Sequence, residues 1–190
     1  EAGSVAPGCA GCIVAAGSMK SCANSGKISI SGSIEAASIS AAGVVLGVGK
    51  ATSWKNSGAI SVSAIGNGSM NDECIAAGVA VEVDTAVSCS NTGKVSMNAT
   101  VEAVDPHRVG GVFGSVTKSA SKCYNKGAVS FSGKSHRGLY VGGLGAYLPK
   151  VSQSYNKGAV TVKLSAARKA EENKIGGVCG ATVDMRNCYN

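Results

Sequence analysis

The feature that most constrains this chain is an asparagine that recurs at an almost constant interval along its whole length. The column consists of Asn24, Asn56, Asn91, Asn125, Asn156 and Asn190, separated by 32, 35, 34, 31 and 34 positions. Around two of them the chain repeats itself nearly letter for letter, as SKCYNKGAVSF at 121–131 and SQSYNKGAVTV at 152–162. A period of this length predicts a solenoid, in which each repeat is one unit that packs only on its neighbours.

Two glycine columns accompany the asparagines. The first lies two positions after five of them, at Gly26, Gly58, Gly93, Gly127 and Gly158. The second lies thirteen positions before the asparagine, or fourteen in one repeat, at Gly11, Gly43, Gly78, Gly111, Gly143 and Gly177. Glycine adopts backbone angles that other residues avoid, so we expect the first column to occupy a turn that needs such an angle.

Each Asn-x-Gly is followed by a segment in which apolar and polar residues alternate. The five segments are KISIS (27–31), AISVS (59–63), KVSMN (94–98), AVSFS (128–132) and AVTVK (159–163). Alternation with a period of two predicts a β-strand that buries one face. Each repeat is therefore expected to contain three short strands: one that starts at the second glycine column, one that ends in the asparagine, and the alternating segment.

These patterns predict an all-β fold, a right-handed parallel β-solenoid of about six rungs that forms a single repeat domain over residues 1–190. Equivalent residues of successive rungs should stack about 4.8 Å apart. At that spacing the recurring asparagines can form a ladder in which each side-chain amide bonds to the next.

Three later repeats carry a more specific pattern. GGVFG (110–114), GGLGA (142–146) and GGVCG (176–180) are followed by CYN, SYN and CYN. This pattern resembles the GLUG repeat, and in weaker form the resemblance extends over essentially the whole chain. It implies a β-helical module of large secreted or cell-surface proteins, often adhesins or surface-anchored enzymes, in which the repeat is scaffold. We therefore expect an extracellular or cell-surface protein.

Composition and charge narrow the classes further. No apolar run approaches the roughly 18 to 20 residues that span a bilayer, so no membrane span is expected. Residues 1–105 carry five Lys or Arg and eight Asp or Glu, a net charge of −3. Residues 106–190 carry thirteen and three, a net charge of +10. A basic half attracts phosphate without specificity, but the chain contains no recognised nucleic-acid-binding module, so no specific nucleic-acid partner is expected.

A column of mostly cysteines lies two positions before the asparagines. It reads Cys22, Trp54, Cys89, Cys123, Ser154 and Cys188. One thiol per rung is not the clustered ligand set that metal ions need, so we interpret the column as small buried side chains that fill a corner. The isolated pair Cys9 and Cys12 has no second pair or nearby histidine, and it is a weak redox or metal motif. No cofactor and no metal are expected.

Groups for acid–base chemistry are sparse. Glu82 and Asp84 are near each other on one strand, but neighbouring rungs supply no acid in those columns. A paired-carboxylate enzyme needs two such groups to converge, so a non-enzymatic module is expected, with a β-helical polysaccharide lyase or hydrolase as the alternative. His107 and His136 fall in connections between rungs, where we expect them to be solvated.

The basic half offers a candidate binding surface. Tyr124, Tyr155 and Tyr189 directly precede an asparagine, and Lys126 and Lys157 directly follow one. If these side chains point outward, they form a stripe of aromatic and cationic groups that can stack on sugar rings and pair with sulfate or carboxylate. The alternative is that the tyrosines pack against the turn. Anionic glycans are accordingly the candidate ligand.

The two ends of the sequence suggest partners. The chain stops with CYN at 188–190, and its first residues, EAGSV, fit the positions of the repeat that follow such an asparagine. The chain is therefore expected either to stack head to tail with another copy, as in a filament, or to be flanked by further repeats of a longer protein. Stacked copies would bring Cys188 toward Cys22, and Cys179 toward Cys12. Asn67 and Asn98 fit the N-glycosylation sequon.

Overall fold

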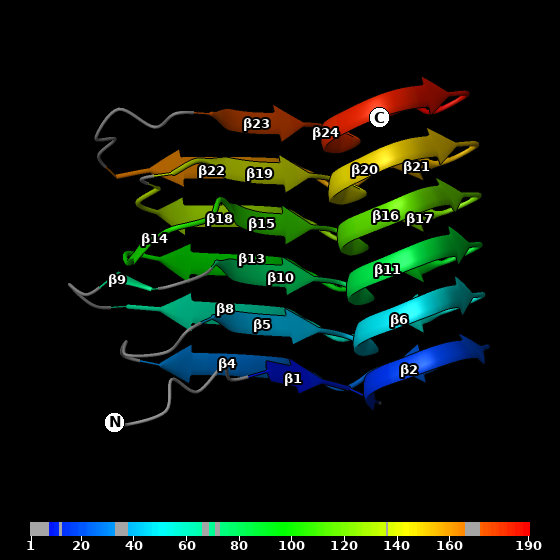
Figure 1. The fold of residues 1–190 in the computed structure, drawn as a ribbon, viewed down its shortest axis with the longest axis horizontal. Coiled ribbons are helices and arrows are strands. Elements are labelled where there is room, and N and C mark those ends of the chain that lie inside the picture. The colour runs from blue at the N-terminus through cyan, green and yellow to red at the C-terminus, as the bar shows by residue number, and fades with distance from the viewer. Residues whose placement is uncertain are drawn as a thin grey trace.

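The computed structural model describes residues 8–11, 13–32, 38–65, 69–70, 73–135, 137–165 and 172–190. Throughout these residues the regular elements are strands, and none is a helix. In Figure 1 the nearer strands run left to right, the farther strands run back, and the chain rises from β1 to β24, so the coil is right-handed. The predicted all-β, right-handed parallel β-solenoid is confirmed.

Two of the parallel sheets hold the strands that precede and follow the second glycine column. Sheet A consists of β1 (Gly8–Ala10), β5 (Ile39–Ala42), β10 (Cys74–Ala77), β15 (His107–Gly110), β19 (Leu139–Gly142) and β23 (Asn173–Gly176). Sheet B consists of β2 (Ile13–Lys20), β6 (Val45–Thr52), β11 (Ala80–Val87), β16 (Phe113–Ser121), β20 (Gly145–Ser152) and β24 (Cys179–Arg186).

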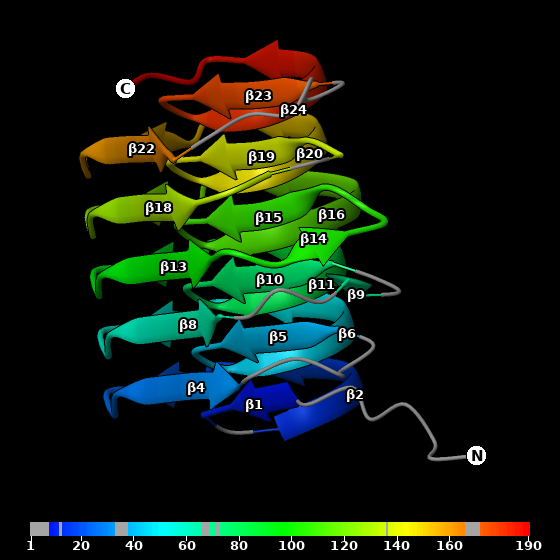
Figure 2. The ribbon, with the colours of Figure 1, turned by 90° about the vertical axis from the view of Figure 1, so that its left-hand side faces the viewer.

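Two further sheets lie on either side of the asparagine. Sheet C consists of β3 (Ala23–Asn24), β7 (Lys55–Asn56), β12 (Ser90–Asn91), β17 (Tyr124–Asn125) and β21 (Tyr155–Asn156). Sheet D consists of β4 (Ile28–Gly32), β8 (Ile60–Ala64), β13 (Val95–Ala99), β18 (Val129–Gly133) and β22 (Val160–Leu164), and Figure 2 shows these strands as one column. Two connections also pair with each other through β9 (Ser69–Met70) and β14 (Glu102–Ala103).

The prediction of three strands per rung is wrong, because each complete rung contributes four. Five rungs supply a strand to every one of the four sheets, and a sixth adds β23, β24 and a bridge between Tyr155 and Tyr189, so the rung number differs slightly from the expected six. Sheet A was missed because its strands are at most four residues long and follow connections of variable length. A strand of three or four residues is too short for an alternating pattern to be distinguished from chance.

The recurring asparagines form a continuous hydrogen-bonded ladder inside the solenoid. In every step from Asn24 to Asn190, the Nδ2 of one asparagine donates to the Oδ1 of the next, at 2.7–2.9 Å. The second Nδ2 hydrogen donates to the carbonyl oxygen of the residue two positions later, at 2.6–2.9 Å. In four rungs the N–H of that residue donates back to Oδ1, at 3.1–3.2 Å.

The ladder satisfies amide groups that have no access to water. Asn91 and Asn125 are fully buried, and each uses both donor hydrogens and accepts two hydrogen bonds through Oδ1. An amide has two donors and two acceptor sites, so the hydrogen-bonding capacity of these side chains is full. Unpaired polar groups in such a place would each cost about 1–3 kcal/mol.

The second glycine column exists because the ladder leaves no room for a side chain. A Cβ at Gly78 would lie 2.6 Å from Cγ of Asn91 and would overlap the carbonyl oxygen of Gly111 on the next rung. The other five positions of this column meet the asparagine of their own rung in the same way. The asparagine therefore selects glycine at the start of sheet B, thirteen or fourteen residues earlier in the sequence.

The left-handed backbone angle lies at a position the sequence did not indicate. Among the described glycines only Gly133 and Gly138 have a positive φ, so the expectation for the first glycine column is wrong. That column is glycine because the rungs approach closely: a Cβ at Gly93 would overlap the carbonyl oxygen of Gly58. The left-handed residues, with φ of 49–58°, are Ser21, Ser53, Ser88, Lys122, Gln153 and Asn187, three positions before each asparagine.

The apolar interior is divided in two by the contact between asparagine and glycine. One large cluster lies behind sheet B and includes Val83, Phe113 and Trp54. The other lies between sheets A and D and includes Met97 and Phe131. The second glycine column lies between sheets A and B, and the asparagines lie between sheets C and D. Where glycine and asparagine touch, the two sides of the rung come close together and separate the two apolar clusters.

Replacing Asn91 with leucine should destabilise the protein by at least about 3 kcal/mol, because it leaves buried partners on Asn56, Gly93 and Asn125 without hydrogen bonds. Urea unfolding followed by circular dichroism measures the change. Asn98→Leu is the matched control, since Asn98 is exposed and only accepts a 3.4 Å hydrogen bond from Ser132; we expect a change of about 0.5 kcal/mol or less. Equal effects would contradict the structural role of the ladder.

Candidate binding surface

Three tyrosines stack on one another on the outside of sheet C. Tyr124 and Tyr155 begin β17 and β21, and Tyr189 occupies the same position of the sixth rung. Their ring centroids are 5.2 and 5.0 Å apart, and neighbouring ring planes are within 7° of parallel. The parallel register of the rungs builds this stack, because it places equivalent side chains directly above one another.

A lysine accompanies each of the two rings nearest the middle of the chain. Lys126 Nζ lies 5.5 Å from the centroid of the Tyr124 ring, and Lys157 Nζ lies 5.7 Å from the centroid of the Tyr155 ring. Both distances are in the range of cation–π attraction. The structure thus brings together the five residues Tyr124, Lys126, Tyr155, Lys157 and Tyr189.

The stack limits how this surface can hold a flat ligand. Each face of the Tyr155 ring is covered by a neighbouring tyrosine, so no sugar ring can stack on it. Free ring faces remain only at the two ends of the stack, on Tyr124 and on Tyr189. The expected stripe of stacking platforms is thereby reduced to two positions, and the ring edges between them point away from the stack axis.

A hollow of about 310 Å³ lies beside the lower end of the stack. The tyrosine position continues into the earlier rungs as Ser90, Lys55 and Ala23. Two of these three side chains are small, which leaves open space next to the Tyr124 ring. Ser57 and Thr92, from the neighbouring position, supply hydroxyl groups to the same hollow.

The corner that contains sheet C is uniformly cationic. It comprises the segments 21–27, 53–59, 88–94, 122–128, 153–159 and 187–190, all of them described. These segments contain six lysines and neither aspartate nor glutamate. The six are Lys27, Lys55, Lys94, Lys122, Lys126 and Lys157, and all are exposed. A one-sided distribution of charge of this kind attracts anionic partners.

The cysteine column is part of the backbone hydrogen bonding of the corner. The side chains of Cys22, Cys89, Cys123, Ser154 and Cys188 each donate to the carbonyl oxygen two residues earlier, on the other side of the left-handed residue. In two rungs the Sγ or Oγ also accepts an N–H from the rung below, as from Cys89 to Cys123 and from Cys123 to Ser154. Serine replaces cysteine here because a hydroxyl can make the same hydrogen bonds.

Six cysteines have side chains that the structure describes, and none of these six forms a disulfide: Cys22, Cys74, Cys89, Cys123, Cys179 and Cys188. Cys89, Cys123 and Cys179 are buried, whereas Cys22 and Cys188, at opposite ends of the column, are half-buried. Burial raises the pKa of Cys179 to about 12, with a further contribution from Cys188. The side-chain hydrogen bond with the Cys89 thiol and then burial raise the pKa of Cys123 well above its ordinary value. The register places Cys179 in the column of Ile13, and Cys12 lies outside the described residues.

A buried polar cluster that no sequence pattern indicated lies at the start of sheet A. His107 is 1% exposed, so the expectation that it is solvated is wrong. Its Nδ1 accepts the backbone N–H of Cys74 at 3.1 Å. Beside it, Arg108 Nε and Glu73 Oε2 form a 2.9 Å ion pair. Burial and then Glu73 raise the pKa of the Cys74 thiol to about 12, which keeps it protonated. His136 is not among the described residues.

Four carboxylates in the described ranges, Glu73, Asp84, Glu172 and Asp184, pair with cations. Asp84 accepts hydrogen bonds from Lys118 at 2.8 Å and from Thr117 at 2.7 Å, which hold its pKa below the usual value. Glu82, its neighbour on β11, is exposed. Glu172 pairs with Lys174 at 2.8 Å. These contacts arrange the acids as partners of surface cations.

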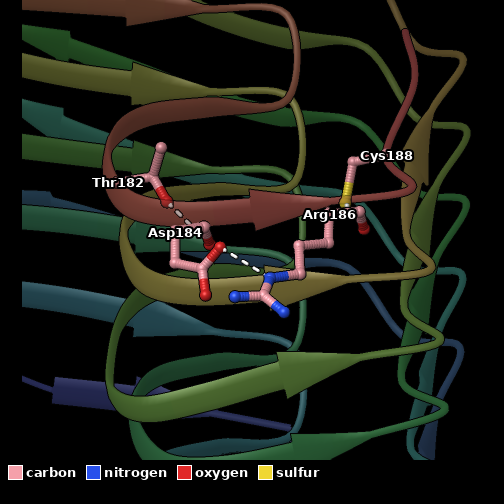
Figure 3. A network of polar contacts seen from close by, with 4 residues as sticks. All are labelled: Thr182, Asp184, Arg186 and Cys188. Carbon is pink, nitrogen blue, oxygen red and sulfur yellow. Dashed lines mark hydrogen bonds and ion pairs between the residues drawn. The ribbon is translucent and has the colours of Figure 1, made fainter.

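A second hollow, of about 450 Å³, opens at the end of sheet B. Figure 3 shows its upper margin, where Arg186 Nε lies 3.1 Å from Asp184 Oδ1, and the Cys188 thiol donates to the carbonyl oxygen of Arg186. Lys150, in register with Asp184, also lines this hollow. The second hollow therefore has a carboxylate in its lining, whereas the lining of the hollow beside Tyr124 has none.

Three remaining features complete the description. Asn98 of the predicted glycosylation sites is exposed on β13, and Asn67 lies outside the described residues. Within the described ranges, no group of three or more His, Cys, Asp and Glu side chains is placed to hold a metal ion. No helix long and apolar enough to cross a membrane is found in the part of the chain that the structure describes.

In comparisons with known proteins, no family model matches this chain, and no curated protein or solved structure matches it significantly. The chemistry of the surface is therefore argued from its own residues.

Thiol accessibility should separate the two half-buried ends of the cysteine column from the buried thiols of sheets A and B. At pH 8 a thiol with a pKa of about 12 is only about one part in ten thousand thiolate, so Cys74 and Cys179 should alkylate far more slowly than the half-buried Cys22 and Cys188. Their rates should rise about tenfold per pH unit below the pKa. Peptide mapping by mass spectrometry after timed iodoacetamide exposure measures this, with urea-unfolded protein as control. Equal rates for Cys179 and Cys188 in the folded protein would contradict the described burial.

The tyrosine stack should contribute measurably to stability. Tyr155→Ala removes the middle ring and should cost about 1–2 kcal/mol, whereas Tyr155→Phe keeps both stacking contacts and should change stability by about 0.5 kcal/mol or less. Tyr147→Ala is the control, because Tyr147 is a 36% exposed tyrosine on sheet B outside this stack. Urea unfolding is again the measurement, and a phenylalanine variant as unstable as the alanine variant would show that stacking is not the source.

Proposed function

We propose that this chain is a non-enzymatic, extracellular or cell-surface β-solenoid module that serves adhesion or structural assembly, with its stack of rungs continued by a second copy or by flanking repeats of a longer protein. The observation that carries the proposal is the regular stack of rungs joined by the asparagine ladder. β23 and β24 lie at the edges of sheets A and B and have no strand on their outer side. Parallel strand edges normally require a cap or a partner.

The side chains at the open face of the last described rung have the character of an interior. Ile175 is in register with Val141, and Met185 with Val151, both of which are buried. In the last rung, however, Ile175 is 50% exposed and Met185 is 42% exposed, because no rung covers them. Another rung placed on this face would bury them in the two clusters that run through the solenoid.

A second copy of the chain or a flanking repeat of a longer protein can supply the rung that covers this face. Copies joined head to tail would form a joint that repeats without closing. The resemblance to the GLUG repeat supports a scaffold role at the cell surface. In such a joint Cys188 would approach Cys22 of the next copy.

Multi-angle light scattering over a concentration series tests the assembly. We expect the mean mass to grow with concentration, and Ile175→Lys to reduce it to that of a single chain by placing a charge on the open face. Ile65→Lys is the matched control, because Ile65 is 52% exposed in a connection away from this face. Loss of mass on adding reductant would assign part of the joint to cysteines. A constant single-chain mass at all concentrations would overturn end-to-end assembly.

A further inference from the structure

We propose that the hollow beside Tyr124 binds an anionic oligosaccharide, a chain of uronic acid residues, with one sugar ring stacked on the free face of the Tyr124 ring. The proposal names a partner for adhesion and so rests on the proposed function. It uses the side of the solenoid rather than its open end, so ligand binding and end-to-end assembly can be measured separately.

The Tyr124 ring provides a flat platform at one wall of the hollow. Tyr155 covers one face of this ring at a centroid distance of 5.2 Å. The opposite face borders the hollow, because the next residue in register is the small Ser90. The apolar face of a pyranose ring stacks on such a platform for the same reason that aromatic rings bury area against one another. A bound sugar would extend the stack by one ring.

The other walls provide the polar groups that a sugar requires. Ser57 and Thr92 are exposed and present hydroxyls, and Lys55 is exposed on the rung between Ser90 and Ala23. The volume, about 310 Å³, lies at the small end of the range of about 300 to 1,000 Å³ that is typical of small-ligand sites. The hollow therefore suits a few sugar rings.

Charge selects an acidic sugar over a neutral one. The corner of sheet C carries six exposed lysines and no carboxylate over its whole described length. Lys55 lies in the hollow itself, and a carboxylate on a sugar seated there would find no competing acid within the corner segments. A neutral sugar would leave this lysine without a new partner.

The lysines beyond the hollow continue the site along the solenoid. Lys126 and Lys157 lie one rung apart beside the stacked rings, and rungs repeat about every 4.8 Å. These lysines add positive charge next to the hollow and attract the carboxylates of a uronate chain that extends beyond it.

The same observations disfavour single-stranded nucleic acid. Proteins that bind it without sequence preference offer several aromatic faces on which successive bases stack. Here the rings stack on one another at 5.0–5.2 Å and leave no space for a base between them. One free face beside hydroxyl groups is suited to a sugar.

Isothermal titration calorimetry with a galacturonic acid hexamer tests the proposal. The protein carries Ile175→Lys and is used at a concentration where light scattering shows single chains, so that assembly does not contribute. We expect saturable binding that weakens as salt is raised. A neutral galactose oligomer of equal length and an oligothymidylate are titrated in parallel, and both should bind at least about tenfold more weakly.

Four variants locate the binding on the surface. Tyr124→Ala should weaken it about tenfold, as expected for one stacked ring. Lys55→Gln should weaken it several-fold and flatten its salt dependence. The matched controls are Tyr147→Ala and Lys163→Gln, which remove an exposed ring from sheet B and an exposed charge from sheet D, and both should bind as the parent does.

A filling variant guards against loss of folding. Ser90→Tyr adds a fourth ring to the stack, occupies the hollow and covers the Tyr124 face, so it should abolish binding. Because Ser90 is only 4% exposed, urea unfolding of this variant against the parent establishes that it folds. Unchanged binding by Ser90→Tyr or Tyr124→Ala would overturn the proposal, as would equal affinity for the neutral oligomer. Tighter binding of oligothymidylate would replace it with a nucleic-acid site. If the parent protein binds the galacturonic acid hexamer but shows no growth of mass with concentration, this proposal stands and only the end-to-end stacking is overturned.

Discussion

The asparagine ladder is the interaction on which the rest of this solenoid depends. Each amide is bonded to the next at 2.7–2.9 Å, which is possible only when successive rungs are in register and about 4.8 Å apart. A slip of one residue in any rung would leave buried amide groups unpaired. The ladder thereby fixes the register of all four sheets. It leaves no room for a side chain in the second glycine column, which contacts the asparagines, and the close approach of the next rung leaves none in the first.

Because the rungs are in strict register, the outer surface consists of columns of equivalent residues stacked along the solenoid. Where a column repeats one residue type, its side chains satisfy one another, as the tyrosines do by covering each other's faces. New chemistry can then arise only where the repeat is broken. The hollow beside Tyr124 is such a place, because serine, lysine and alanine replace tyrosine in the three rungs below it.

Buried cysteine and histidine side chains in the solenoid act as hydrogen-bonding partners of the backbone. A column of thiols suggests redox or metal chemistry, but here the thiols donate to carbonyl oxygens across the left-handed turns, and Ser154 does the same with a hydroxyl. His107 likewise accepts a backbone N–H within the core. In both cases the polar atoms serve the backbone of neighbouring rungs, and burial keeps Cys74 protonated.

The sequence by itself determined the solenoid, its parallel stacking and the position of the ladder, because a rung that packs on its own copy must repeat its turn residues at a fixed interval. It did not reveal sheet A, because strands of at most four residues are too short to show a periodic pattern. It also did not reveal the left-handed residues, which are serine, lysine, glutamine or asparagine. It grouped the tyrosines and lysines correctly by spacing. Only the tertiary structure decided which ring faces stay free, how the hollow forms beside Tyr124, and that His107 is buried. These three features depend on contacts between residues about thirty positions apart. The volume and direction of each side chain decide them, and neither can be read from the spacing of residues in the sequence.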